Sequence, residues 1–178
     1  MDGLLLDGFI HEKTHDYVIV KEPRPSCLYI NPKIHKQGNP GRPIVSANDR
    51  PTERISEFVD HHLNPEAPKL PSYIKDTTHF LTKLNSLKDI PTGAIIVALD
   101  VASLYTNIPR KDGIQACRDA LDQRTEKLIT TERLCDMIRM ILTMSTFEFN
   151  GEFFVQKHGT AMGTKMAPGI REPLHGKV

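Results

Sequence analysis

The sequence predicts an α+β fold, and three observations support that prediction. Residues 52–63, 110–123 and 130–144 place apolar side chains at the spacing of amphipathic helices. Two further regions have short apolar runs on either side of a turn rich in Gly, Asn or Pro, which is typical of β-hairpins. The run Ala94–Asp100 is apolar up to its final Asp and contains several β-branched residues, as expected for a short strand buried on both faces.

The N-terminal part of the chain predicts one strand and one hairpin. Residues 17–20 favour a strand that is closed by two prolines. Residues 27–30 and 42–46 favour two short strands joined by a turn rich in Gly, Pro and Asn, which predicts a hairpin. The connection carries four basic side chains and no acidic one: Lys33, His35, Lys36 and Arg42. Such a loop either binds phosphates through charge-assisted hydrogen bonds or is a solvated turn, and the local pattern leaves both interpretations open.

Helical periodicity then predicts the middle of the chain. A helix over 52–63 is followed by a Pro-rich connection and a shorter helix that begins at Thr77 or Thr78 and ends near Leu87. We expect these two helices to have only a structural role. Beyond the expected central strand, helices are predicted over 110–123 and 130–144, the latter with Thr131 as its N-cap.

The last predicted sheet element is a second hairpin. Asn150-Gly151 between two aromatic runs, 146–149 and 152–156, is a strong hairpin signal because both turn residues tolerate positive φ. A loop rich in Gly, Thr and other small residues follows, up to Pro168. Residues 169–178 have no periodicity, so we expect them to lack stable structure.

Composition limits the possible environments and partners. The net charge of +1 excludes a global basic field, so any contact with nucleic acid must use a local patch. No apolar run reaches the roughly 20 residues of a membrane span, and residues 1–10 lack the basic start of a secretory signal. The three cysteines are widely spaced, which argues against a disulfide framework or zinc site and predicts a reducing, intracellular setting, either nuclear or cytoplasmic.

Asp100 is the candidate metal ligand. A carboxylate at the end of a buried strand is costly to desolvate unless a cation, backbone donors or water compensates it. Asp also frequently caps the following turn through its side chain. The local pattern supports both interpretations equally.

Three separated segments together resemble the reverse-transcriptase domain of Penelope-like retroelements, and they occur in the same order along the chain as in that family. They are residues 31–36 with 41–46, residues 99–109, and residues 158–168. The resemblance covers about residues 27–168 of the chain. It implies the fingers and part of the palm of a right-handed polymerase. The implied divisions are an N-terminal segment over 1–26, a fingers-like part over 27–93, a partial palm over 94–168 and a divergent tail over 169–178.

The resemblance also implies functional residues and ligands. Arg42 matches the arginine that contacts the incoming triphosphate, with Lys36 as its accompanying lysine and Lys33 as second choice, and Tyr105 matches the aromatic residue under the nucleotide sugar. Asp100 matches the first catalytic carboxylate, which binds a Mg²⁺ pair; two such ions hold the attacking and leaving oxygens in nucleotidyl transfer. The implied contacts to the nascent base pair and template are Gly159, Thr160, Gly163 and Pro168. The implied partners are an RNA or DNA template-primer and a deoxynucleotide, with no membrane; the oligomeric state is not predicted.

Two departures from the family limit the predicted activity. The aromatic-x-Asp-Asp segment that should follow the small-residue loop is absent, since no Asp-Asp pair occurs and no Asp follows Asp136. Pro173 also falls where the palm helix should continue. We therefore expect a fragment truncated within the palm, which alone does not polymerise. The alternatives are a non-catalytic nucleic-acid-binding remnant or a non-functional fragment. A phosphate-loop NTPase is disfavoured, because residues 159–165 have the wrong glycine spacing and end in Gly-Thr-Lys.

Overall fold

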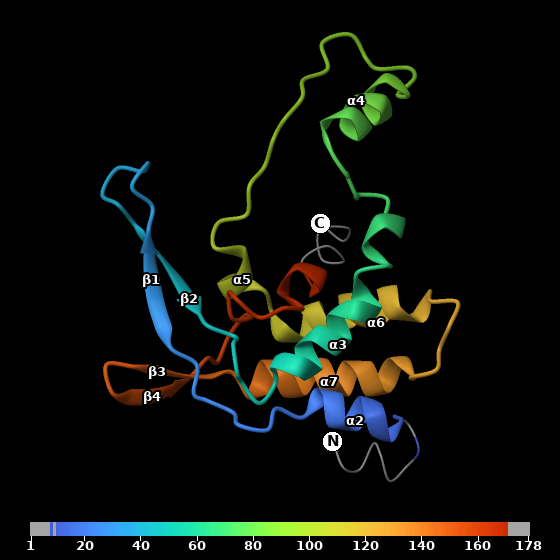
Figure 1. The fold of residues 1–178 in the computed structure, drawn as a ribbon. Coiled ribbons are helices and arrows are strands. Elements are labelled where there is room, and N and C mark those ends of the chain that lie inside the picture. The colour runs from blue at the N-terminus through green and yellow to red at the C-terminus, as the bar shows by residue number, and fades with distance from the viewer. Residues whose placement is uncertain (1–7, 9, 171–178) are drawn as a thin grey trace.

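The computed structural model describes residues 8 and 10–170, and these form a mixed α+β domain with two small sheets (Figure 1). Helices and hairpins alternate unevenly along the chain. The elements are α2 (Glu12–Val18), β1 (Leu28–Pro32), β2 (Gly41–Val45), α3 (Glu53–Leu63), the 3₁₀ turn η1 (Ala67–Lys69), α4 (Thr77–Asn85), α5 (Leu104–Asn107), α6 (Arg110–Asp122), α7 (Thr131–Thr143), β3 (Thr146–Phe149) and β4 (Glu152–Val155).

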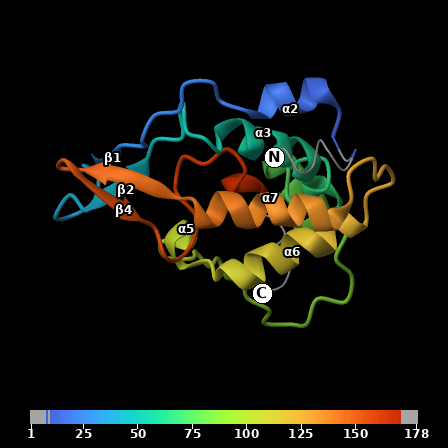
Figure 2. The ribbon, with the colours of Figure 1, turned by 90° about the horizontal axis from the view of Figure 1, so that it is seen from below.

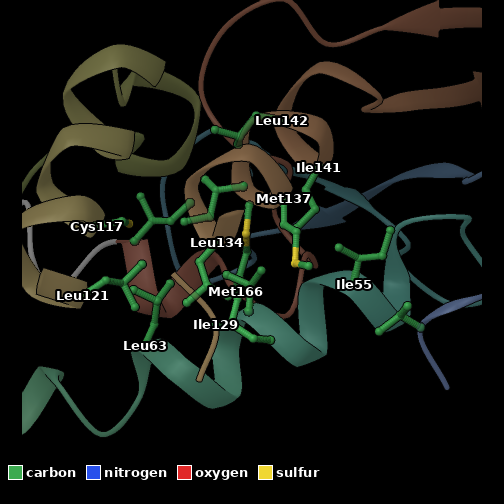
Figure 3. Close-up of a cluster of buried hydrophobic side chains, with 14 of the residues drawn as sticks. Ile55, Leu63, Cys117, Leu121, Ile129, Leu134, Met137, Ile141, Leu142 and Met166 are labelled. Atoms are coloured by element: carbon green, nitrogen blue, oxygen red, sulfur yellow. The ribbon is translucent and has the colours of Figure 1, made fainter. Parts of the chain in front are cut away.

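The core of the domain is helical, and α7 is its centre. This helix contacts both α3 and α6, and α3 also contacts α2 (Figure 2). Its apolar stripe, which includes Leu134, Ile138 and Ile141, is almost completely buried. Leu121 of α6 and Leu63 of α3 belong to the same buried cluster and lie close together in Figure 3. The helical spacing of apolar residues therefore predicted the core correctly, although the N-cap of α7 is Thr130 rather than Thr131.

Both predicted hairpins are confirmed. β1 pairs antiparallel with β2, with Leu28 opposite Val45 and Asn31 opposite Arg42. β3 pairs antiparallel with β4 around Asn150-Gly151, whose φ angles of 52° and 79° are those of a type I′ turn. Each hairpin forms a sheet of its own in the part of the chain that the structure describes. The two sheets project from one end of the helical core (Figure 2).

The strand predicted over 17–20 is wrong, because residues 17 and 18 are the end of the helix α2 and residues 19 and 20, which follow it, pair with no strand. The side chain of His11 caps the helix by accepting a hydrogen bond from the backbone N–H of Lys13. Val18 is buried where α2 contacts α3, whereas Tyr17 is largely exposed, with the guanidinium of Arg54 5.2 Å from its ring centre. Val18 is the one residue of this seven-residue helix that is buried, and its contact with α3 anchors the segment without a neighbouring strand.

The buried central strand predicted over Ala94–Asp100 is also wrong. The segment is extended but unpaired, and the side chains of Ile95, Ile96 and Leu99 are 83%, 76% and 92% exposed. It forms part of a long connection that descends from α4 to α5 (Figure 1). A β-branched run becomes a buried strand only when neighbouring strands and a covering layer are present, and none of the strands within residues 10–170 lies beside it. Asp100 therefore lies in an exposed segment and not at the end of a buried strand.

Two other predictions agree with the structure in part. The helix α4 is confirmed and is capped by Asp76, whose side chain accepts a hydrogen bond from the N–H of His79, but it buries none of its residues. The tail predicted to lack structure from residue 169 onward begins differently, because residues 167–170 are helical and Ile170 is buried in the core. Residues 171–178 lie outside the described part of the chain.

The three cysteines differ in their exposure. Cys117 and Cys135 are free thiols buried in the helical core, and the free thiol of Cys27 is exposed. Burial raises the pKa of Cys117 to about 12, so its thiol stays protonated and unreactive at neutral pH. None of the helices that the structure describes is long and apolar enough to cross a lipid bilayer.

Candidate functional site

Residues predicted separately from the sequence lie around one open pocket of about 560 Å³. The hairpin of β1 and β2 supplies one wall through Lys33, Lys36 and Arg42. The segment from Asp100 to Tyr105 supplies the opposite wall, and Met162 completes the lining. The nucleotide-binding candidates and the candidate carboxylate therefore lie in one site, although they come from distant parts of the sequence. We refer to it as the first pocket.

The tip of the hairpin positions the basic side chains. The N–H of Lys33 donates to the carbonyl of Pro40 at 3.0 Å, and the N–H of Lys36 donates to the carbonyl of Lys33 at 3.0 Å. Gly38 and Asn39 both have positive φ, which reverses the chain between the strands. Because Arg42 pairs with Asn31 near the distal end of the ladder, its side chain and the tip lysines occupy the same region.

A compact turn fixes the opposite wall. Ser103 has a φ of 51°, and the one-turn helix α5 follows immediately. The side chain of Asn107 donates to the carbonyl of Ala102 at 3.1 Å, and the hydroxyl of Thr106 donates to the carbonyl of Ser103 at 2.9 Å. These bonds close the turn on itself, so that Tyr105 is held half-buried at the edge of the pocket.

The small-residue loop joins the two walls. The N–H of Thr160 donates to the carbonyl of Tyr105 at 2.8 Å, and the carbonyl of Met162 accepts from the N–H of Val45 at 3.0 Å. A Cβ at Gly159 would lie 2.3 Å from the carbonyl oxygen of Tyr105. Only a residue without a side chain permits this approach, so the loop acts as a brace between the turn and β2.

The four residues predicted to contact the base pair and template differ in their exposure. Gly159 and Thr160 are buried, whereas Gly163 and Pro168 are exposed. These four are not among the residues that line the first pocket; their neighbour Met162 is. The sequence analysis missed Met162. In the sequence, Met162 lies between Gly159 and Gly163. The backbone at these two glycines packs closely against other segments, which brings the Met162 side chain to the edge of the pocket. The position of Met162 between the glycines could therefore have identified it.

The same loop does not resemble a phosphate-binding loop in its contacts. The ammonium of Lys165 lies 3.3 Å from Glu57 and 3.8 Å from Glu53, on α3. Met166 donates its N–H to the hydroxyl of the buried Ser56 at 3.0 Å. The loop is thus anchored to α3, which agrees with the wrong motif spacing in disfavouring the NTPase interpretation.

The charges of the first pocket favour an anionic ligand. Three cationic side chains and one carboxylate give its lining a net formal charge of +2. No ion pair within residues 10–170 involves Lys36, Arg42 or Asp100. These cations are therefore available to an anion from solution.

The donor set does not fit the Mg²⁺ pair that the resemblance implies. Asp100 supplies the one carboxylate among the residues lining the first pocket, and a single carboxylate cannot hold two divalent ions. In the part of the chain that the structure describes, no group of three His, Cys, Asp or Glu side chains is arranged to bind a metal ion.

No known protein-family model, curated protein or solved structure matches this chain.

Proposed function

We propose that the first pocket binds the triphosphate of a nucleotide, within the fingers and partial palm of a polymerase domain similar to reverse transcriptases. One observation carries the proposal: Lys36 and Arg42, predicted from one segment, line the same pocket as Asp100 and Tyr105, predicted from another. Three of these four residues belong to the implied nucleotide site and the fourth to the implied catalytic site.

The chemistry of the residues supports this ligand. The guanidinium of Arg42 can donate two parallel hydrogen bonds to phosphate oxygens, and the lysine ammonium groups add positive charge. Tyr105 offers a half-buried ring at the pocket edge, where a nucleoside could pack. Asp100 opposes a phosphate in the absence of a cation, so nucleotide binding in this chain depends on the basic wall.

We predict that Arg42→Gln weakens nucleotide binding at least tenfold. Charge-assisted hydrogen bonds contribute about 1.5–3 kcal/mol each, and the variant loses them. The measurement is titration with a fluorescent deoxynucleoside triphosphate in EDTA. Arg139→Gln is the matched control, because Arg139 pairs with Asp136 on the exposed side of α7. Equal affinities of the two variants would contradict the proposal.

A second measurement tests whether the chain polymerises. With one carboxylate in the pocket, we expect no extension of a primer on an RNA or DNA template, with or without Mg²⁺. Magnesium-dependent synthesis that Asp100→Ala abolishes would contradict this expectation. If nucleotide binds without extension, the chain binds the substrate of a polymerase without carrying out its reaction.

A further inference from the structure

A pocket of about 290 Å³ lies between the end of α3 and the connection from α6 to α7. His61 and His62 of α3 line one side, and Arg124 and Thr125, which follow α6, line the other. This pocket shares no lining residue with the first pocket. We call it the histidine pocket, and none of its lining residues belongs to a segment that carries the family resemblance.

Arg124 is a buried cation with unused hydrogen-bond donors. The residue is 8% exposed, its Nε donates to the carbonyl of Leu121 at 2.9 Å, and its Nη2 donates to the carbonyl of Ile129 at 3.0 Å. Among the residues that the structure describes, none accepts from Nη1, yet Nη1 is not one of the enclosed atoms that lack a partner. Nη1 is therefore reachable from the pocket that Arg124 lines.

No carboxylate among residues 10–170 forms an ion pair with this guanidinium. Glu66 also lines the pocket, but its two oxygens accept from Nζ of Lys69 at 2.9 and 2.7 Å. Burial lowers the pKa of Arg124, against smaller opposing effects of Glu66 and Asp122. A buried charge without a paired ion is costly, so an anion in the pocket would stabilise the charged guanidinium.

The two imidazoles of the pocket lie close together. Their ring centres are 5.5 Å apart, and the ring centre of His62 lies 4.9 Å from that of Phe58. Burial, together with the charges of Arg124 and His61, holds the pKa of His62 below its usual range. His62 is therefore neutral at neutral pH, and a negative charge in the pocket would favour its protonation.

The formal charges around the pocket cancel while the imidazoles are neutral. Arg124 is opposed by the exposed Glu126, and Glu66 by Lys69. Protonation of His62 adds a second positive charge beside Arg124, and an anion that contacts both groups compensates it. Anion binding and proton uptake are therefore linked, so that an anion binds more tightly as the pH falls.

We propose that the histidine pocket binds a small tetrahedral oxyanion of the phosphate and sulfate class. Nη1 of Arg124, the two imidazoles and the hydroxyl of Thr125 offer donors from two sides of the pocket, which suits an ion whose acceptor oxygens point in several directions. The volume of about 290 Å³ also leaves room for waters, each of which occupies about 30 Å³. Because these residues lie outside the first pocket, the inference does not depend on the proposed function.

The test is a titration of the isotope-labelled protein with sodium sulfate at constant ionic strength, followed by the NMR signal of the Thr125 amide. Sulfate stays doubly charged between about pH 5.5 and pH 8, the range in which histidine titrates, so the pH dependence belongs to the protein. The affinity should rise about fivefold from the higher to the lower pH, because a unit charge about 4 Å from an anion contributes about this factor even at the dielectric constant of water. Acetate, a planar ion with one charge, should bind at least about fivefold more weakly than sulfate.

Arg124→Gln should weaken sulfate binding at least about tenfold, because charge-assisted hydrogen bonds are lost. The matched control is Arg139→Gln, which removes an arginine from an exposed ion pair on α7 and should change the affinity less than about twofold. Arg124 also bonds two carbonyls, so its loss can destabilise the domain, and a second variant is needed.

The second variant is His61→Gln/His62→Gln, which removes the titrating groups and leaves Arg124 in place. Its affinity for sulfate should be the same at both pH values. The matched control His35→Gln/His158→Gln removes two exposed histidines outside the pocket and should keep the rise of about fivefold.

Three results would overturn the inference. Equal losses in Arg124→Gln and Arg139→Gln would mean that sulfate senses only the overall charge. A rise in affinity at low pH that persists in His61→Gln/His62→Gln would mean that the imidazoles do not face the ion. Acetate binding as tight as that of sulfate would mean that the pocket does not select a tetrahedral oxyanion.

Discussion

Gly159→Ala should lower the free energy of unfolding by about 2–5 kcal/mol. The left-handed conformation costs a residue with a side chain about 1–2 kcal/mol, and overpacking against fixed atoms adds about 1–3 kcal/mol. Both effects apply here, since Gly159 has a φ of 66° and its Cβ would lie 2.3 Å from the carbonyl oxygen of Tyr105 and 2.6 Å from that of Thr106. Backbone atoms cannot rotate away as a flexible side chain can. Urea denaturation followed by circular dichroism measures the change.

Gly151→Ala separates the two contributions. Gly151 has a similar φ of 79°, but a Cβ there would meet nothing within 4 Å. This variant should therefore lose only the conformational part, about 1–2 kcal/mol. If both variants lost the same amount, the close approach of the small-residue loop to α5 would be refuted.

Ile96→Lys should reduce self-association with little change in stability. The side chain of Ile96 is 76% exposed, and it belongs to a neutral, β-prone run of the kind that pairs with other chains. A lysine there places charge in solvent and interrupts the run, so we expect the free energy of unfolding to change by less than about 0.5 kcal/mol. Light scattering against concentration, together with urea denaturation, measures both effects.

Ile138→Lys is the contrasting variant. Ile138 is completely buried in α7, so a lysine would put an unpaired charge in the core and unfold the domain. The sequence pattern alone predicted burial for both isoleucines. Strong destabilisation by Ile96→Lys would restore the original prediction of a buried strand at Ala94–Asp100 and would contradict the exposed segment.

The parts of the fold that were predictable are those with local causes. Asn150-Gly151 determines a hairpin because its two residues adopt the required positive φ by themselves. The stripe of α7 identifies a core helix because a 3.6-residue period has one structural explanation. The run Ala94–Asp100 failed because burial of a strand depends on partners elsewhere in the chain, which local hydrophobicity does not report.

In the candidate site too, the predictable features are local and the unpredicted ones depend on tertiary contacts. Lys36, Arg42, Asp100 and Tyr105 came from motifs, and they line one pocket. The position of Gly159 against a distant carbonyl depends on tertiary contact, so the motif suggested a ligand contact where the backbone instead packs on backbone.

The small-residue loop, which braces the two walls, affects the stage of folding at which the first pocket forms. Its two hydrogen bonds, from Thr160 to Tyr105 and from Val45 to Met162, join segments that are far apart in the chain. Contacts of this kind form late in folding, because the entropy of closing long loops must be overcome before they contribute. A local opening of this one loop would also release both walls together. We therefore expect opening of this loop to separate the basic wall from the segment that carries Asp100, so that the two walls face each other only while the loop is in place.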